Sequence, residues 1–188
     1  MRHRIFIAIN LPQDVKRGLV KCQSNWPELP AKWVREDSLH ITLAFLGELP
    51  DEELPDILRI CEDVSKRHRS FNIRLEKICY GPPEKMPPRM VWSEGEKSKE
   101  LAELKDDLEN SLAGNLDYTP DSRSFSPHIT LGRINTWEFR KMEPEDCPQV
   151  AEEISLSFRV GSIEIMESQL RRGGSIYTIL QSFPLSSD

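Results

Sequence analysis

The stretch SLHITLAFLGEL, Ser38 to Leu49, contains the tetrapeptide His-Ile-Thr-Leu, which returns unchanged in SPHITLGRI, Ser126 to Ile134. If residues followed one another independently at average frequencies, Ile-Thr-Leu would follow a second His about once in several thousand cases. The repeat therefore indicates a divergent duplication, with one copy of the motif in each half of the chain.

In a β-strand the side chains alternate between two faces, so His40 and Thr42 point one way while Ile41 and Leu43 point the other. The second copy alternates in the same manner, with His128 and Thr130 on one face. The apolar pair of each copy is expected to anchor its strand in the core. If the two halves are related by an approximate two-fold axis, two imidazoles and two hydroxyls then surround one small ligand.

This set of side chains suits the opening of a cyclic phosphodiester. One neutral imidazole accepts a proton from the attacking water and a second, protonated imidazole donates to the departing oxygen, since imidazole titrates near neutral pH. The hydroxyls of Thr42 and Thr130 can donate to the non-bridging phosphate oxygens. The scheme needs no metal and no other cofactor.

Arg133 could add charge-assisted bonds to the phosphate. Strict alternation from His128 points Arg133 away from the histidines, so a kink at Gly132 would have to redirect it. Counted in the same way from Thr42, the side chain of Phe45 is expected on the opposite face of the strand. We expect Phe45 to pack, with stacking on a nucleobase as the alternative.

The composition describes an ordinary globular protein. Of the 188 residues, 38% are hydrophobic and 30% charged, and the formal net charge of −6 argues against binding a long nucleic-acid duplex but not against gripping one phosphate. The apolar runs are strand-sized and the N-terminus lacks a long apolar segment, so we expect a cytoplasmic protein with no membrane association. The four cysteines lie far apart without a CxxC pair, so we expect free thiols.

Strand and helix patterns are interspersed along the chain, and antiparallel-looking strand pairs favour an α+β fold over a doubly wound parallel sheet. Apolar residues recur at helical spacing in three segments: after Pro12, after Pro50 and through Lys97–Gly114. We expect two lobes that meet roughly between residues 80 and 95, and a meander formed by the last three strands. Besides the second motif, strands are expected at 5–9, 39–46, 71–80, 90–93, 154–158, 162–166 and 175–180.

Four other functional interpretations are weaker: a role for His3 or His68, a metal site, a pure binding module and a partner-docking surface. His3 and His68 belong to no repeated motif, so structural roles are expected for them. A mononuclear metal site is disfavoured because there is no HExxH motif and no carboxylate at ligand spacing from either motif histidine. A pure phosphate-binding module would have little reason to keep two proton-transfer groups, and a helical partner-docking surface is less favoured than a solvated charged face.

With both motifs in place, the sequence resembles the two-histidine (2H) phosphoesterases, and within them the RNA 2′,3′-cyclic phosphodiesterases, also called 2′-5′ RNA ligases. Nearly the whole chain takes part. The segments that carry the resemblance are RIFIAINLP, KWVREDSLHITLAFLGEL, PRMVWSEG, SFSPHITLGRI and GGSIYTILQSFPL. The last is preceded by Arg-Arg where the family pattern has a proline beside the glycine, which leaves the shape of that loop open.

The resemblance implies a single domain over 1–188 made of two duplicated lobes in a pseudo-two-fold arrangement. Each lobe is expected to be an antiparallel sheet with helices packed outside, and the active site to lie in the cleft between the sheets. The family pattern carries over to five residues of this chain: His40 and His128 as the catalytic pair, and Thr42, Thr130 and Arg133 as phosphate-binding residues.

The implied reaction is metal-independent hydrolysis of RNA or oligonucleotide 2′,3′-cyclic phosphate ends to 2′-phosphate ends. Reverse 2′-5′ ligation follows from microscopic reversibility. Analogy within the superfamily makes His40 the acid and His128 the base. The partners expected for this monomeric protein are RNA cyclic phosphate termini, and the basic residues near the motif strands are candidates for further RNA contacts: Arg4, Lys32, Arg35, Arg89, Arg171 and Arg172.

Overall fold

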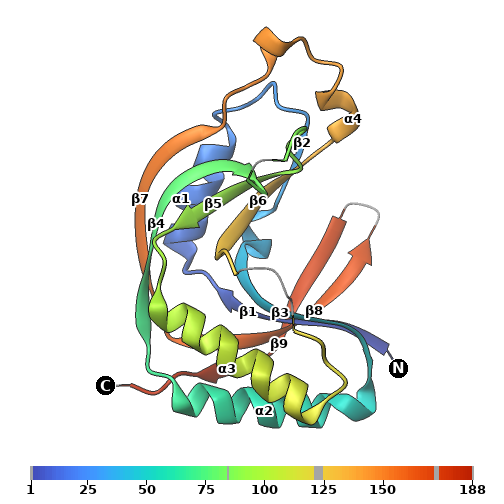
Figure 1. The fold of residues 1–188 in the computed structure, drawn as a ribbon, viewed down its shortest axis with the longest axis vertical. Helices are drawn as coiled ribbons and strands as arrows, with labels where there is room; N and C mark the ends of the chain where they lie inside the picture. Colours follow the sequence, from blue (N-terminus) through green and yellow to red (C-terminus); the bar gives the residue numbers. More distant parts are fainter. Residues whose placement is uncertain (1, 84, 121–124, 172–173, 188) are drawn as a thin grey trace.

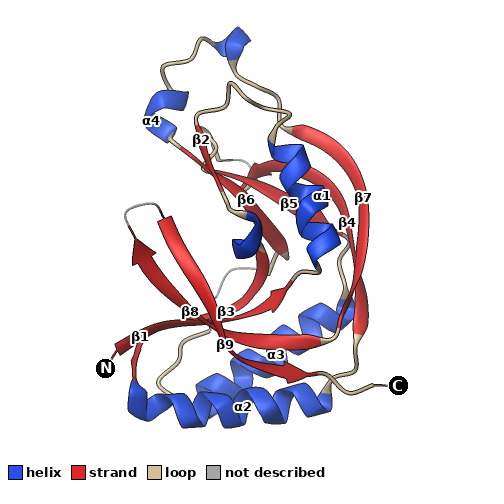
Figure 2. Cartoon of the chain, turned by 180° about the vertical axis from the view of Figure 1, so that it is seen from behind, coloured by secondary structure: helices blue, strands red, loops and turns tan. Residues whose placement is uncertain are grey.

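The computed structural model describes residues 2–83, 85–120, 125–171 and 174–187. Within this part, nine strands form one curled sheet in the order β7-β4-β5-β6-β3-β1-β8-β9, with β2 paired to β6 (Figure 1). All recorded pairings between these strands are antiparallel, and the helices pack against the sheet (Figure 2). The α+β class predicted from the sequence is confirmed.

The elements have the following bounds. The strands are β1 (Arg2–Asn10), β2 (Ala31–Trp33), β3 (His40–Pro50), β4 (Phe71–Gly81), β5 (Met90–Gly95), β6 (His128–Ile134), β7 (Ala151–Val160), β8 (Ser162–Arg171) and β9 (Gly174–Pro184). The α-helices are α1 (Gln13–Gln23), α2 (Leu54–Arg67), α3 (Lys99–Asn115) and α4 (Thr136–Phe139).

Local sequence accounts for the long helices. The Ser98 hydroxyl accepts a hydrogen bond from the Leu101 amide at 3.1 Å and so caps α3, whose leucines at 101, 104, 108 and 112 are all buried. Pro55 falls in the first turn of α2, where a missing N–H costs no helical hydrogen bond. Both α2 and α3 therefore begin at residues that suit the first turn of a helix, and each buries one apolar stripe.

The two motif strands lie beside each other. β3 pairs with β6 through Ile41 and Ile129, the same position of the two tetrapeptides. We call β3, β1, β8 and β9 the first half-sheet, and β6, β5, β4, β7 and β2 the second half-sheet. We expected a separate sheet for each lobe; instead the half-sheets are continuous, because the duplicated strands pair directly with each other.

Strands from the two halves of the sequence are exchanged between the half-sheets. β8 and β9 join the first half-sheet, whereas β4 and β5 belong to the second. The predicted three-strand meander is wrong for β7, which pairs along β4 and not with β8. Only Gly161 separates β7 from β8, and a hairpin normally needs a loop of two or more residues, so the chain crosses to the other half-sheet.

Helices are also exchanged between the half-sheets. α1 follows β1 but packs against β6 and β7, while α3 follows β5 but packs against α2 and β3 (Figure 1). A contiguous cluster of buried side chains lies between these helices and the sheet and draws on both half-sheets. The described part of the chain holds no helix long and apolar enough to cross a membrane.

Candidate active site

One face of the two motif strands is buried and the other is open. Ile41 and Leu43 are each 2% exposed and pack in the core, while His40 and Thr42 are only partly buried on the opposite side. The second copy repeats this pattern residue for residue. We call the side of the sheet that carries both motif histidines the histidine face.

The register brings the two motifs together. Ile41 pairs with Ile129 in antiparallel strands, so the second residues of the two tetrapeptides lie side by side. Continued by one residue in each direction, this register would set His40 opposite Thr130 and Thr42 opposite His128, with each set on the same face of the sheet.

Both imidazoles are held in the same way. The Nδ1–H group of His40 donates to the Ser38 carbonyl oxygen at 2.7 Å, and that of His128 donates to the Ser126 carbonyl oxygen at 2.8 Å. A carbonyl can only accept, so the neutral ring carries its proton on Nδ1 and keeps a lone pair on Nε2. For His40 this Nε2 lies 3.1 Å from the Thr42 hydroxyl oxygen, within the motif.

The rings around the two histidines differ. His128 stacks on Trp92, with 3.7 Å between ring centroids and an interplanar angle of 19°. His40 instead touches Phe6 at 4.9 Å and Tyr177 at 5.2 Å, the latter edge-on. The duplication therefore preserves the reactive side chains, whereas the aromatic rings that pack against them differ between the two copies.

Burial lowers the pKa of His40 to about 4. The carbonyl of Ser38 raises the pKa, but less than burial lowers it, and the positive charges of Lys16, His128 and Arg133 lower it further. His40 is therefore a neutral base at pH 7 in the unliganded protein. The same result shows that His128 and Arg133 lie close enough to interact electrostatically with His40.

A β-bulge turns Arg133 toward the histidine face. Thr130 and Gly132 pair with consecutive residues of β5, which leaves Leu131 as an extra residue in β6. Burial shifts accordingly: Leu131 and Gly132 are both buried, and Arg133 is exposed. Strict alternation was expected to point Arg133 away from the histidines, and the bulge is the physical reason that it does not.

The first motif strand contains the same irregularity. Thr42 and Ala44 pair with consecutive residues of β1, so Leu43 is the extra residue and Phe45 emerges on the histidine face. We expected Phe45 to pack, with stacking on a nucleobase as the alternative; it is 70% exposed, and its ring centroid lies 5.9 Å from that of Phe6. Phe45 occupies the position in β3 that Arg133 occupies in β6.

The other two histidines contact carboxylates outside this face. His3 Nε2 is 2.7 Å from Asp51 and its Nδ1 is 2.5 Å from Glu167; the hydrogen bond to Glu167 is the main cause that raises the pKa of His3. His68 Nε2 lies 2.9 Å from Asp107. Within the described residues, no group of three or more His, Cys, Asp or Glu side chains could hold a metal ion.

No sequence pattern identifies several residues that lie next to the site. Lys16 of α1 is buried near His40, and burial lowers its pKa; Trp92 and Tyr177 reach the histidines from distant strands. A register must be known before such contacts can be inferred. Of the basic residues considered for RNA contacts, Arg172 lies outside the described residues, as does the side chain of Arg171, and four are exposed: Arg4, Lys32, Arg35 and Arg89.

The chain matches the family model described as "LigT like Phosphoesterase" twice, over residues 9–92 and 94–177. The chain belongs to the LigT-like phosphoesterase family. The resemblance inferred from the two motifs is thereby confirmed, and the double match divides the sequence into two units, each with one copy of the motif.

Curated relatives span nearly the whole chain. The RNA 2′,3′-cyclic phosphodiesterase of Thermus thermophilus is 35% identical, covering 98% of this chain and 91% of the relative. That of Methanocaldococcus jannaschii is 28% identical, covering 96% and 99%. Both alignments therefore extend well beyond the motifs.

Solved structures of this family share the fold. TT0787 of Thermus thermophilus superposes with a TM-score of 0.84 at 29% identity, covering 97% of both chains. Escherichia coli LigT, solved in complex with 3′-AMP, has a TM-score of 0.79 at 25% identity, covering 99% of both. The curled sheet with its exchanged elements is thus the architecture of this LigT-like family.

The bulge beside Arg133 can be tested through Gly132. A Cβ at this position would lie 2.8 Å from the Trp33 ring, so Gly132→Ala should force the β2–β6 pair apart and move Arg133. We expect the free energy of unfolding, measured in urea, to fall by about 1–3 kcal/mol. Phosphoesterase activity of the folded variant should also fall.

Gly161→Ala is the matched control, because a Cβ there meets no atom within 4 Å. It should leave both quantities near their original values. Equal stability and activity of Gly132→Ala and the unmodified protein would contradict the proposed packing constraint on the bulge.

Proposed function

We propose that this chain hydrolyses RNA 2′,3′-cyclic phosphate ends to 2′-phosphate ends without a metal ion. The observation that carries the proposal is the pair of imidazoles from the two motif strands, each anchored through Nδ1 so that Nε2 is the ring nitrogen for proton transfer, together with two threonines and Arg133. The names and full-length similarity of the curated relatives support the substrate class.

In the proposed reaction, water attacks the phosphorus while one imidazole takes a water proton at Nε2. The bond from phosphorus to the 3′ oxygen breaks, and the second imidazole donates its Nε2 proton to that oxygen. Thr42 and Thr130 donate to the non-bridging oxygens, and the Arg133 guanidinium stabilises the charge that builds up on them. If a 5′-hydroxyl attacks the cyclic phosphate in place of water, the same proton transfers release the 3′ oxygen and form a 2′-5′ phosphodiester.

Electrostatics favour His40 as the base and His128 as the acid. His40 is neutral at pH 7 because its pKa is about 4. The cross-strand neighbours also differ: Asn10 lies opposite His40, whereas Glu94, which pairs with Lys77, lies opposite His128. This division reverses the one that analogy within the superfamily implies.

Exposed Phe45 fits the terminal nucleobase. It lies on the histidine face beyond Thr42, beside Phe6, which with Ala8 and Met166 forms a small apolar cluster against which Tyr177 packs. Aromatic faces stack on any base, so such a contact would position the nucleoside with little sequence preference.

We infer that residues 1–188 act as a single domain of two duplicated, pseudo-two-fold lobes with the active site in the cleft between them, which the double family match supports. One chain supplies both histidines, so a monomer would suffice. A cytoplasmic location fits the four free cysteines.

The reaction is tested with an oligoribonucleotide that ends in a 2′,3′-cyclic phosphate, analysed by mass spectrometry and phosphorus NMR in the presence of EDTA. We expect complete conversion to the 2′-phosphate. A 3′-phosphate product would overturn the choice of leaving oxygen, and tight binding without turnover would favour a phosphate-binding module.

Replacing either motif histidine should remove one proton-transfer group. We expect His40→Ala and His128→Ala each to lower kcat by about two to four orders of magnitude, measured with the same substrate. His68→Ala is the matched control, because His68 pairs with Asp107 away from the site. Full activity in either motif variant would contradict the paired mechanism.

The low pKa of His40 predicts a pH dependence. Below about pH 4 His40 becomes protonated and loses its ability to accept a proton, so kcat/KM should fall as pH decreases through that region. A pH–rate profile on the unmodified protein measures this limb, and a limb centred well above pH 4 would contradict the lowered pKa. Either division of roles uses the singly protonated pair of imidazoles, so the roles themselves are assigned with a modified substrate.

A substrate with sulfur in place of the 3′ bridging oxygen provides a second readout, because a departing thiolate needs no proton. It should restore much of the rate of His128→Ala and little of that of His40→Ala. The opposite pattern would exchange the two roles.

A further inference from the structure

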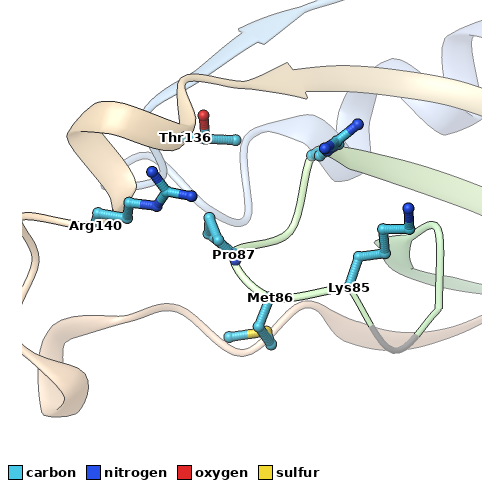
Figure 3. Close-up of a pocket in the computed structure, with 6 residues that line it drawn as sticks. Lys85, Met86, Pro87, Thr136 and Arg140 are labelled. Carbon is cyan, nitrogen blue, oxygen red and sulfur yellow. The ribbon is translucent and has the colours of Figure 1, made fainter.

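A cavity of about 340 Å³ lies at one edge of the second half-sheet, between the loop that joins β4 to β5 and the short helix α4 (Figure 3). Figure 3 shows side chains from both segments around it, with Arg140 of the α4 side and Lys85 of the loop at opposite ends. We call it the α4 cavity. Its lining residues are Lys85, Met86, Pro87, Arg89, Thr136 and Arg140.

The charge of the α4 cavity is opposite to that of the whole protein. Three of its six lining residues are cationic and none is acidic, in a chain of formal net charge −6. In the described part of the chain, Lys85, Arg89 and Arg140 have no carboxylate partner. The second cavity, beside the start of α3, is lined by both signs of charge. Like charges gathered around a hollow favour an anionic ligand.

Basic side chains connect the α4 cavity with the histidine face. Arg89 directly precedes Met90, whose cross-strand partner is Arg133, and Lys32 lies opposite Arg133 on the other side. Thr136 follows Arg133 by three residues, about 10 Å of extended chain. A strand whose terminal phosphate lies between the histidines can therefore follow this basic path away from Phe45.

Exposed apolar surface lies beside the same cavity. Met86 is 79% exposed, and Trp137, next to Thr136 in α4, is 63% exposed with the Lys141 ammonium 3.1 Å from its ring centroid. Cationic side chains interleaved with an exposed aromatic ring are the usual composition of surfaces that bind single-stranded nucleic acid.

We propose that the α4 cavity binds the sugar-phosphate backbone of the RNA strand on the 5′ side of the cyclic end. Arg89, Arg140 and Lys85 contact phosphodiester oxygens, which carry charge but no sequence information. The site holds ground state and transition state alike, so it lowers KM for oligonucleotides and leaves kcat unchanged. The inference rests on the proposed function, whose reaction it extends from the end group to the strand.

The test compares two substrates of the same protein, a nucleoside 2′,3′-cyclic phosphate and an oligoribonucleotide with the same cyclic end. The double substitution Arg89→Ala and Arg140→Ala should raise KM for the oligonucleotide about tenfold or more and leave kcat in place. Kinetics with the cyclic mononucleotide should be unchanged. The salt dependence of oligonucleotide KM should become shallower, by about one unit of slope for each lost contact.

Arg17→Ala is the matched control. Arg17 is an exposed arginine on α1, which packs on the buried side of β6, so its loss changes the net charge without touching the cavity. It should leave both substrates unaffected. Equal effects of the double variant on both substrates, or none on the oligonucleotide, would overturn the subsite.

A binding experiment separates failure of the subsite from failure of the proposed function. Fluorescence anisotropy with an oligoribonucleotide that ends in a 2′-phosphate needs no turnover. If the unmodified protein hydrolyses neither substrate, the proposed function fails, and the subsite is still supported by weaker binding of the double variant. Equal binding of the double variant and the unmodified protein would overturn the subsite.

Discussion

The antiparallel pairing of Ile41 with Ile129 is the contact on which the site depends. It joins the half-sheets at the second residue of each repeated tetrapeptide and so brings the two His-x-Thr motifs side by side. A slip of one residue in this register would turn a whole set of side chains to the other face of its strand. The burial of Ile41, Leu43 and their counterparts in the helix-covered core opposes any such slip.

Two equal β-bulges extend this symmetry by one further residue on each strand. An extra leucine in each strand makes two consecutive residues face the core, Leu43 and Ala44 in β3 and Leu131 and Gly132 in β6, before the chain returns to the open face. The returning residue is Phe45 in one strand and Arg133 in the other. A symmetric backbone thus presents an aromatic ring at one end of the site and a cation at the other. This difference between the two ends would define the orientation of a bound nucleotide.

The surroundings of the two imidazoles break the symmetry where chemistry requires it. Both rings have the same hydrogen bond to a carbonyl two residues earlier, so both offer Nε2 to the ligand. Desolvation and nearby cations keep His40 neutral, whereas His128 stacks on a tryptophan and has a carboxylate at the opposed position of β5. The two copies of one motif therefore lie in different electrostatic and aromatic surroundings.

The sequence by itself determined the α+β class, the pairing of two His-x-Thr motifs and the family, because a repeated tetrapeptide with strand alternation is a local pattern. Only the tertiary structure decided the single continuous sheet, the exchange of helices and strands between the half-sheets, and the positions of Phe45 and Arg133. These depend on strand register and on one-residue bulges, which arise from pairing with distant strands. The lowered pKa of His40 likewise comes from burial and from charges far away in the chain, such as Lys16, so no local pattern could have predicted it.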